Sequence, residues 1–128
     1  MVKRVALDTN AAIALLNNRK EIYAAISLYD VICLPVIVCG ELIFGAKNSQ
    51  LSAKNEKRYS AFLETCEILD VNQLVAENYA NIRFELKRKG RPIPENDIWI
   101  AAICLVNEIP LYTYDKHFQY IKGIKILS

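Results

Sequence analysis

The sequence predicts an α/β domain whose central sheet is parallel and covered by helices on both faces. Short apolar runs typical of buried strands alternate with longer segments of helical periodicity, and no repeat or domain linker interrupts them. The 128 residues, of which 53% are apolar and 23% charged, suffice for one folded core. We therefore expect a single domain spanning residues 1–128, with four to five short strands.

The first strand and the first helix are expected over Val2–Leu7 and Ala11–Leu16. Thr9 or Asn10 can cap this helix, because short polar side chains accept hydrogen bonds from the first amides of a helix. A second helix is expected over Glu21–Tyr29, where the apolar residues share one face.

The alternation continues through the middle of the chain. Val31–Leu34 predicts the second strand, and Pro35 suits the first turn of a helix over Val36–Lys47. A helix over Leu51–Cys66 and a third strand over Glu67–Val71 follow. Strands separated by helices pair in parallel, because each connection must cross back over the sheet.

The last part of the chain predicts two further helices and two further strands. Leu74–Lys89 is amphipathic and ends at Gly90, whereas Glu95–Asn107 is apolar on nearly every side and therefore reads as a buried helix. Strands are expected over Pro110–Thr113 and Lys125–Leu127, with a loop or short turn between them.

Charge, cysteines and hydropathy exclude several classes of protein. A net charge of +2 gives no reason by itself to expect nucleic-acid binding. The four cysteines form no C-x-x-C pair and lie in apolar runs, which favours reduced, buried thiols over a zinc site. No signal peptide is visible, and no apolar run approaches the roughly 20 residues that span a bilayer. We expect a cytoplasmic protein without a membrane partner.

Four acids stand where predicted elements meet a loop or a helix: Asp8, Glu41, Asp97 and Asp115. Ligands of parallel α/β sheets bind beyond the carboxyl ends of the strands, so all four acids can project to one edge. Two carboxylates 4 Å apart repel by about 4 kcal/mol at an effective dielectric near 20. Protons or a cation must relieve this repulsion, and hard oxygen ligands select Mg²⁺ or Mn²⁺ over zinc. Such an ion suggests phosphodiester chemistry.

Each acid also has a simpler interpretation. Asp8 alone reads as a helix cap, Asp97 as a first-turn acid that the helix dipole favours, and Asp115 as a turn residue. Glu41 is harder to dismiss, because it lies in an apolar stretch where an unpartnered carboxylate is costly. The placement of all four acids at one predicted edge favours a common site.

The same residues resemble the motifs of the PIN-domain nucleases, and more narrowly of the VapC-type toxins of toxin–antitoxin pairs. The matching stretches, in chain order, are Leu7–Asn10, Glu41-Leu42 with Gly45, Pro94–Asp97 running into Ile100–Ala102, and Leu111–Asp115 with His117-Phe118. Each stretch is a weak signal alone, whereas the ordered set covers essentially the whole chain.

The resemblance implies a PIN-like three-layer sandwich and a Mg²⁺- or Mn²⁺-dependent endoribonuclease. By this resemblance Asp8 and Asp97 are the primary metal ligands, Glu41 and Asp115 are supporting acids, and Thr113, like Thr9, supplies a hydroxyl near the site. It further implies a homodimer, a VapB-like antitoxin as partner, and a structured RNA, either a tRNA or a ribosomal RNA loop, as substrate.

Two alternatives remain open at this point. A phosphatase of the haloacid dehalogenase type also begins with Asp after a strand, but it needs a second Asp two residues later, where this chain has Asn10. A PIN-like module could also bind RNA or a partner without catalysis.

Basic, histidine and tryptophan residues outside the four acids also lead to expectations. The expected RNA contacts form two basic clusters, one with Lys47, Lys54, Lys57 and Arg58, the other with Arg83, Lys87, Arg88, Lys89 and Arg91. RNA affinity needs such cations, because an acidic pocket repels phosphate. His117 is expected to be a surface or packing residue, and Trp99 to lie in the core or a dimer interface.

Overall fold

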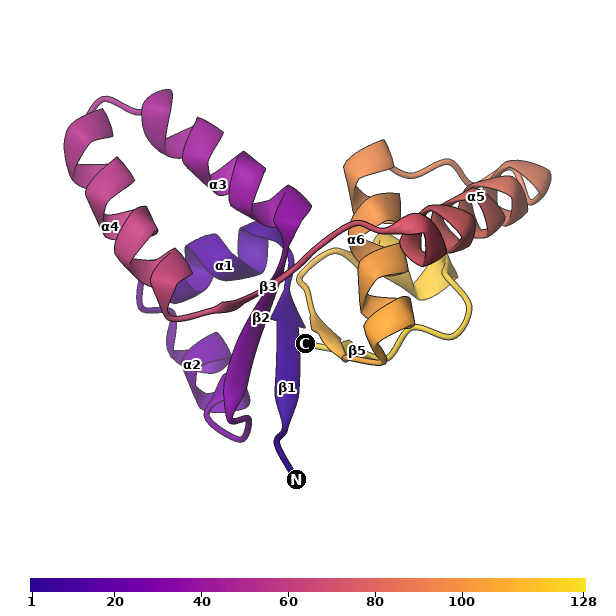
Figure 1. The fold of residues 1–128 in the computed structure, drawn as a ribbon, viewed down its shortest axis with the longest axis horizontal. Helices are drawn as coiled ribbons and strands as arrows, with labels where there is room; N and C mark the ends of the chain where they lie inside the picture. The colour runs from indigo at the N-terminus through magenta and orange to yellow at the C-terminus, as the bar shows by residue number, and fades with distance from the viewer.

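The computed structural model describes residues 1–128 and contains one five-stranded parallel sheet flanked by helices (Figure 1). The strand order is β3-β2-β1-β4-β5, so β1 lies at the centre. The strands are β1 (Arg4–Leu7), β2 (Val31–Pro35), β3 (Glu67–Leu69), β4 (Leu111–Tyr112) and β5 (Ile126–Leu127). The predicted α/β class is confirmed.

The helices divide into two groups on either side of the sheet (Figure 1). The first group comprises α1 (Thr9–Leu16), α2 (Lys20–Ile26), α3 (Val36–Lys47) and α4 (Ser52–Glu64). The second comprises α5 (Gln73–Arg88), α6 (Glu95–Asn107) and a short 3₁₀ helix, η1 (Lys116–Tyr120). The predicted helices are all present, with ends that differ by a few residues. None of them has the length and apolar composition that a membrane span requires.

The cap of α1 corrects one expectation from the sequence and confirms another, the interpretation of Asp8 as a helix cap. Neither Thr9 nor Asn10 caps this helix, because both already lie within its first turn. Asp8 is the capping residue, and its Oδ1 accepts a hydrogen bond from the Ala11 amide at 2.9 Å. The strand passes directly into the helix, so the acid at the end of β1 is also the first residue of the turn.

The core lies around β1 and α6. Val5, Ala6 and Leu7 of β1 have no exposed surface, and α6 buries nearly every residue from Ile98 to Cys104. Trp99 is partly buried and stacks on Tyr79 of α5, with ring centroids 3.8 Å apart. Residues at the end of β1 and at the start of α6 are therefore held by packed, rigid elements.

The four cysteines are free thiols in the structure. Cys33, Cys39 and Cys104 are buried, whereas Cys66 is partly buried. Burial raises the pKa of Cys33 to about 11, so this thiol stays protonated at neutral pH. These residues pack as small apolar side chains.

Ile100 tests whether α6 anchors the fold. Its side chain is fully buried, so Ile100→Ala should lower the free energy of unfolding by about 2–5 kcal/mol, and the milder Ile100→Val by about 0.5–1.5 kcal/mol. Urea denaturation followed by circular dichroism measures both changes. A loss below about 1 kcal/mol for Ile100→Ala would show that α6 is not packed as described.

Candidate functional site

The four predicted acids line one pocket beyond the carboxyl ends of β1 and β4, where α6 begins. The pocket has a volume of about 440 Å³, and its lining includes neither Lys nor Arg. It is lined by Asp8, Thr9, Asn10, Glu41, Pro94, Glu95, Asn96, Asp97 and Asp115. The structure therefore brings together the acids that are separated by up to 107 positions in the sequence.

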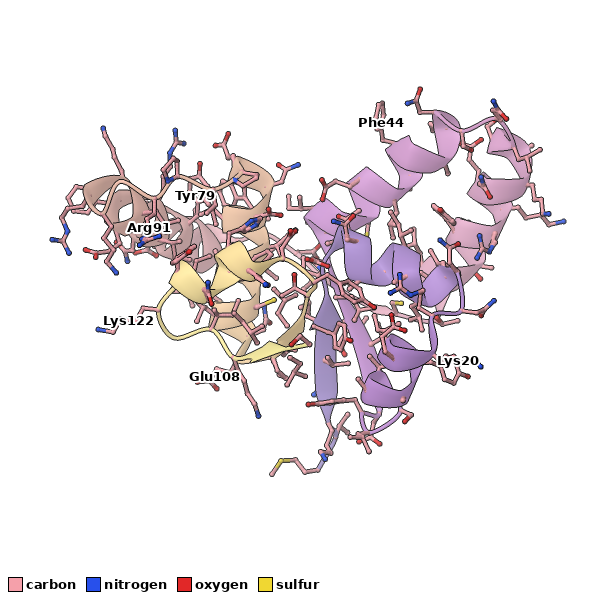
Figure 2. The ribbon with its side chains drawn as sticks, turned by 180° about the vertical axis from the view of Figure 1, so that it is seen from behind. Lys20, Phe44, Tyr79, Arg91, Glu108 and Lys122 are labelled. Carbon is pink, nitrogen blue, oxygen red and sulfur yellow. The ribbon has the colours of Figure 1, made fainter.

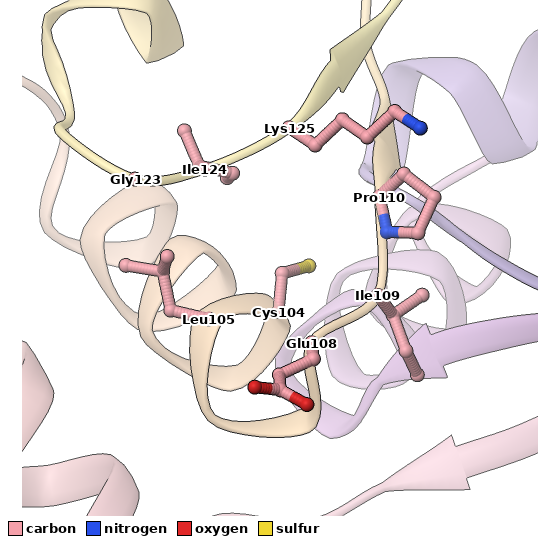
Figure 3. A pocket seen from close by; sticks show the side chains of 8 residues that line it. All are labelled: Cys104, Leu105, Glu108, Ile109, Pro110, Gly123, Ile124 and Lys125. Carbon is pink, nitrogen blue, oxygen red and sulfur yellow. The ribbon is translucent and has the colours of Figure 1, made fainter.

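A second pocket of similar size has a different composition. It lies where α6 ends and β4 begins, and its lining combines apolar side chains with one acid, Glu108, and one base, Lys125 (Figure 3). A single acid beside a lysine cannot build a carboxylate cluster. Only the pocket at the start of α6 concentrates negative charge.

Asp8 is held by two hydrogen bonds at the end of β1. Its Oδ1 accepts from the Ala11 amide, and its Oδ2 accepts from the Thr113 hydroxyl at 2.5 Å. The Thr113 oxygen in turn accepts from the Asp115 amide at 3.0 Å. Asp8 and Thr113 are both almost fully buried, so this chain of bonds joins the ends of β1 and β4.

Burial raises the pKa of Asp8 above its ordinary value. The hydrogen bonds from Thr113 and Ala11 oppose this shift, whereas the negative charges of Asp115 and Asp97 add to it. Without a cation, the protein therefore carries an ionised carboxylate at a cost in stability.

Glu41 has the partner that its apolar surroundings led us to expect. The Thr9 hydroxyl donates to Glu41 Oε1 at 2.5 Å, and the Asn96 side-chain amide lies 3.5 Å from Oε2. These contacts come from the first turns of α1 and α6, so three helices meet at this carboxylate.

Asp97 and Asp115 share a neighbour, His117, whose part in the site the sequence reasoning missed. His117 Nε2 lies 2.8 Å from Asp97 Oδ2 and 4.0 Å from Asp115 Oδ2. Burial raises the pKa of Asp97, while the hydrogen bond and charge of His117 oppose the rise. The expectation of a surface or packing role was wrong, because η1 turns the chain back toward the pocket. The sequence signals were its spacing two residues after Asp115 and its place in the last of the stretches that resemble the PIN-domain motifs.

The residues around this pocket fit a hard divalent cation. One ligand atom each from Asp97, Asp115 and His117 can be chosen so that all lie within 4.8 Å of one another. Opposite ligands of an octahedral ion with bonds of about 2.1 Å are roughly 4.2 Å apart, which is comparable. Asp8 and Glu41 add carboxylate oxygens to the same pocket, and no cationic Lys or Arg side chain among the lining residues neutralises them.

Known proteins resemble this chain over almost its whole length. The PIN domain family matches residues 5–124. Ribonuclease VapC1 of Haemophilus influenzae (strain R2866) is 33% identical over 124 residues, which cover 93% of this chain and 92% of that protein. The tRNA(fMet)-specific endonuclease VapC of Salmonella typhimurium (strain LT2) is 32% identical over 123 residues, which cover 94% and 93%.

A solved structure shows the same fold. The crystal structure of DNA-bound VapBC from Salmonella typhimurium contains a chain that matches with a TM-score of 0.89 and 31% sequence identity, covering 99% of this chain and 98% of that one. Sequence and fold agree with the resemblance that the motifs indicated, so the chain belongs to the PIN-domain family and, within it, to the VapC-type ribonucleases of toxin–antitoxin pairs.

Proposed function

We propose that this protein is an endoribonuclease that depends on Mg²⁺ or Mn²⁺ and cleaves structured RNA. The observation that carries the proposal is the convergence of Asp8, Glu41, Asp97 and Asp115 on one pocket without a neutralising Lys or Arg in its lining. Four carboxylates in such a pocket favour a divalent cation, and PIN-domain membership favours nuclease chemistry at that cation.

The acids differ in exposure: Asp8 is almost fully buried, and the Asp97 side chain is 19% exposed against 39% for Asp115. Asp8 and Asp97 would hold the ion, with Glu41 and Asp115 supporting it directly or through bound water. A bound divalent ion supplies an activated water and stabilises the charge that develops on the scissile phosphate. Thr113 holds Asp8 in place, and His117 does the same for Asp97. Partners that fix a metal ligand in this way commonly change affinity or activity by about 10–100-fold when removed.

The relatives favour one class of substrate and one kind of partner. A relative 32% identical is named a tRNA(fMet)-specific endonuclease, which favours a tRNA over a ribosomal RNA loop as the substrate. Similar chains have been solved as VapBC assemblies, which favours a VapB-like antitoxin as partner. We further propose a homodimer that acts in the cytoplasm, where tRNA is found.

The site disfavours the two alternatives. The Asn10 side chain lines the pocket, but an amide does not exchange protons as the acid–base Asp of a phosphatase must. A binding module without catalysis has no need for four mutually repelling carboxylates, yet all four are retained here. Cleavage of RNA, with small phosphomonoesters left intact, would separate the proposal from both.

Asp8→Asn and Asp97→Asn should each lower RNA cleavage by at least about a thousandfold, since each removes a charged ligand. Asn caps helices as well as Asp does, so Asp8→Asn should fold normally. Asp70→Asn, at an exposed acid outside the pocket, is the matched control and should cleave at the parental rate. Single-turnover cleavage of a tRNA transcript measures all three, and retained activity in either pocket variant would refute the proposal.

Removal of divalent ions should abolish cleavage, and Mg²⁺ or Mn²⁺ should restore it. Isothermal titration calorimetry should detect binding of Mn²⁺ to the parent protein and much weaker binding to Asp97→Asn. Full activity in excess EDTA would contradict the metal requirement, whatever the state of the acids.

The raised pKa of Asp8 predicts how stability without metal depends on pH. The folded state holds the Asp8 proton more tightly than the unfolded state, so stability falls as pH rises from the unfolded pKa, about 3.9, through the folded one. At pH 7 and without metal, Asp8→Asn should therefore melt at a higher temperature than the parent. The difference should shrink on acidification to pH 4 and also on addition of Mn²⁺. A lower melting temperature for the variant at pH 7 would contradict this account.

A further inference from the structure

One cationic face forms where the end of α5 meets η1, although its residues are about 30 positions apart in the chain. Residues 85–91 and 116–122 together contain six Lys and Arg and one Glu, a net charge of +5. The whole chain carries +2, so the other residues sum to −3. Figure 2 shows Arg91 and Lys122 on this same part of the molecule. We name it the α5–η1 face, made of Arg88, Lys89, Arg91 and Lys122 around Tyr120.

The structure shows direct contacts within this face. Tyr120, Lys122, Arg88 and Lys89 line one hollow of about 470 Å³ between α5 and η1. The Arg91 guanidinium lies over the Tyr120 ring, 4.4 Å from its centroid. Glu85 lines the same hollow and accepts a hydrogen bond from Arg88 at 2.9 Å. That bond and the charges of Arg88, Lys89 and Lys122 lower the pKa of Glu85.

The simplest explanation accounts for only part of this charge. Lys and Arg in the last turn of a helix stabilise its dipole, and this suffices for Arg88 and Lys89. Arg91 and Lys122 lie outside the helix and are exposed, yet they join the same surface. An unbalanced group of exposed cations from two segments is the electrostatic footprint of a polyanion.

The face is joined to the acidic pocket at both of its segments. Arg91 stands six residues before Asp97, so their Cα atoms are at most about 20 Å apart even in a fully extended chain. Lys116 directly follows Asp115, and η1 continues from there to Tyr120. A polyanion bound on the α5–η1 face can therefore reach the pocket, which itself repels phosphate.

The other basic cluster, on α3 and α4, is less suited to binding a polyanion beside the acidic pocket. Lys47 is paired with Glu56 at 2.7 Å, and Arg58 donates to the backbone carbonyl of Leu16. Figure 1 shows α4 at the outer edge of its group of helices, away from α6. Lys47 and Arg58 therefore make contacts within the protein, and only Lys54 and Lys57 of this cluster have no such contact described above.

From these observations we infer that the α5–η1 face binds the phosphate backbone of the RNA substrate and delivers a neighbouring phosphodiester to the acidic pocket. The inference rests on the proposed function and adds where the RNA lies. The exposed Tyr120 ring beneath Arg91 is suited to stacking with an unpaired base, a contact that single-stranded RNA offers.

Two triple variants with equal change in charge test the inference. The first combines Lys89→Gln, Arg91→Gln and Lys122→Gln, and the matched control combines Lys3→Gln, Lys20→Gln and Lys125→Gln, three exposed lysines outside both basic clusters. Both are made in the Asp97→Asn background so that RNA is bound without turnover. Fluorescence anisotropy with a labelled tRNA transcript gives Kd over a range of salt, and circular dichroism verifies folding.

The first variant should weaken RNA binding by roughly tenfold or more and reduce the slope of log K against log salt by about 2–3, close to one for each lost phosphate contact. The control should stay within about twofold of the parent. Equal losses in the two variants would overturn the inference. RNA affinity equal to that of the parent in the first variant would also overturn the inference, even if that variant no longer bound a cognate antitoxin. The proposed function is judged separately, by cleavage with Asp97 intact.

Discussion

Mutual repulsion of carboxylates in one pocket is the constraint on which this structure depends. Burial and neighbouring negative charge both raise the pKa of Asp8, and burial raises that of Asp97. A flexible scaffold would relieve the repulsion by moving the acids apart. Here Asp8 directly follows Val5–Leu7, which are fully buried, and Asp97 lies in the first turn of a helix whose next turn is packed in the core, so the acids cannot separate.

Hydrogen bonds from neutral side chains make this arrangement tolerable. The hydroxyls of Thr113 and Thr9 each donate to one acid, and each comes from an element other than that of its acceptor. These hydroxyls fix the direction of the carboxylates and leave their negative charge in place, whereas a lysine would neutralise it. The pocket thus keeps the negative charge that the proposed divalent cation would bind, at a cost in stability.

The net charge of only +2 results from two regions of opposite charge that nearly cancel. Negative charge is concentrated at the pocket, whereas positive charge is concentrated where α5 meets η1. A nuclease needs both, since the acids that would hold the metal repel the backbone that is to be cut. Whole-chain charge averages over these two regions and for that reason indicates neither.

Local sequence determined the elements and the acids. Apolar runs and helical periodicity were enough to predict the strands, the buried helix after Pro94 and the positions of Asp8, Asp97 and Asp115 near element ends, because these depend on spacing within a few residues. Only tertiary structure decided that Thr113 bonds Asp8, that His117 bonds Asp97, and that Lys122 lies beside Lys89. Each of these depends on how a turn directs the chain or on which segments meet across the fold, and neither is encoded in local periodicity.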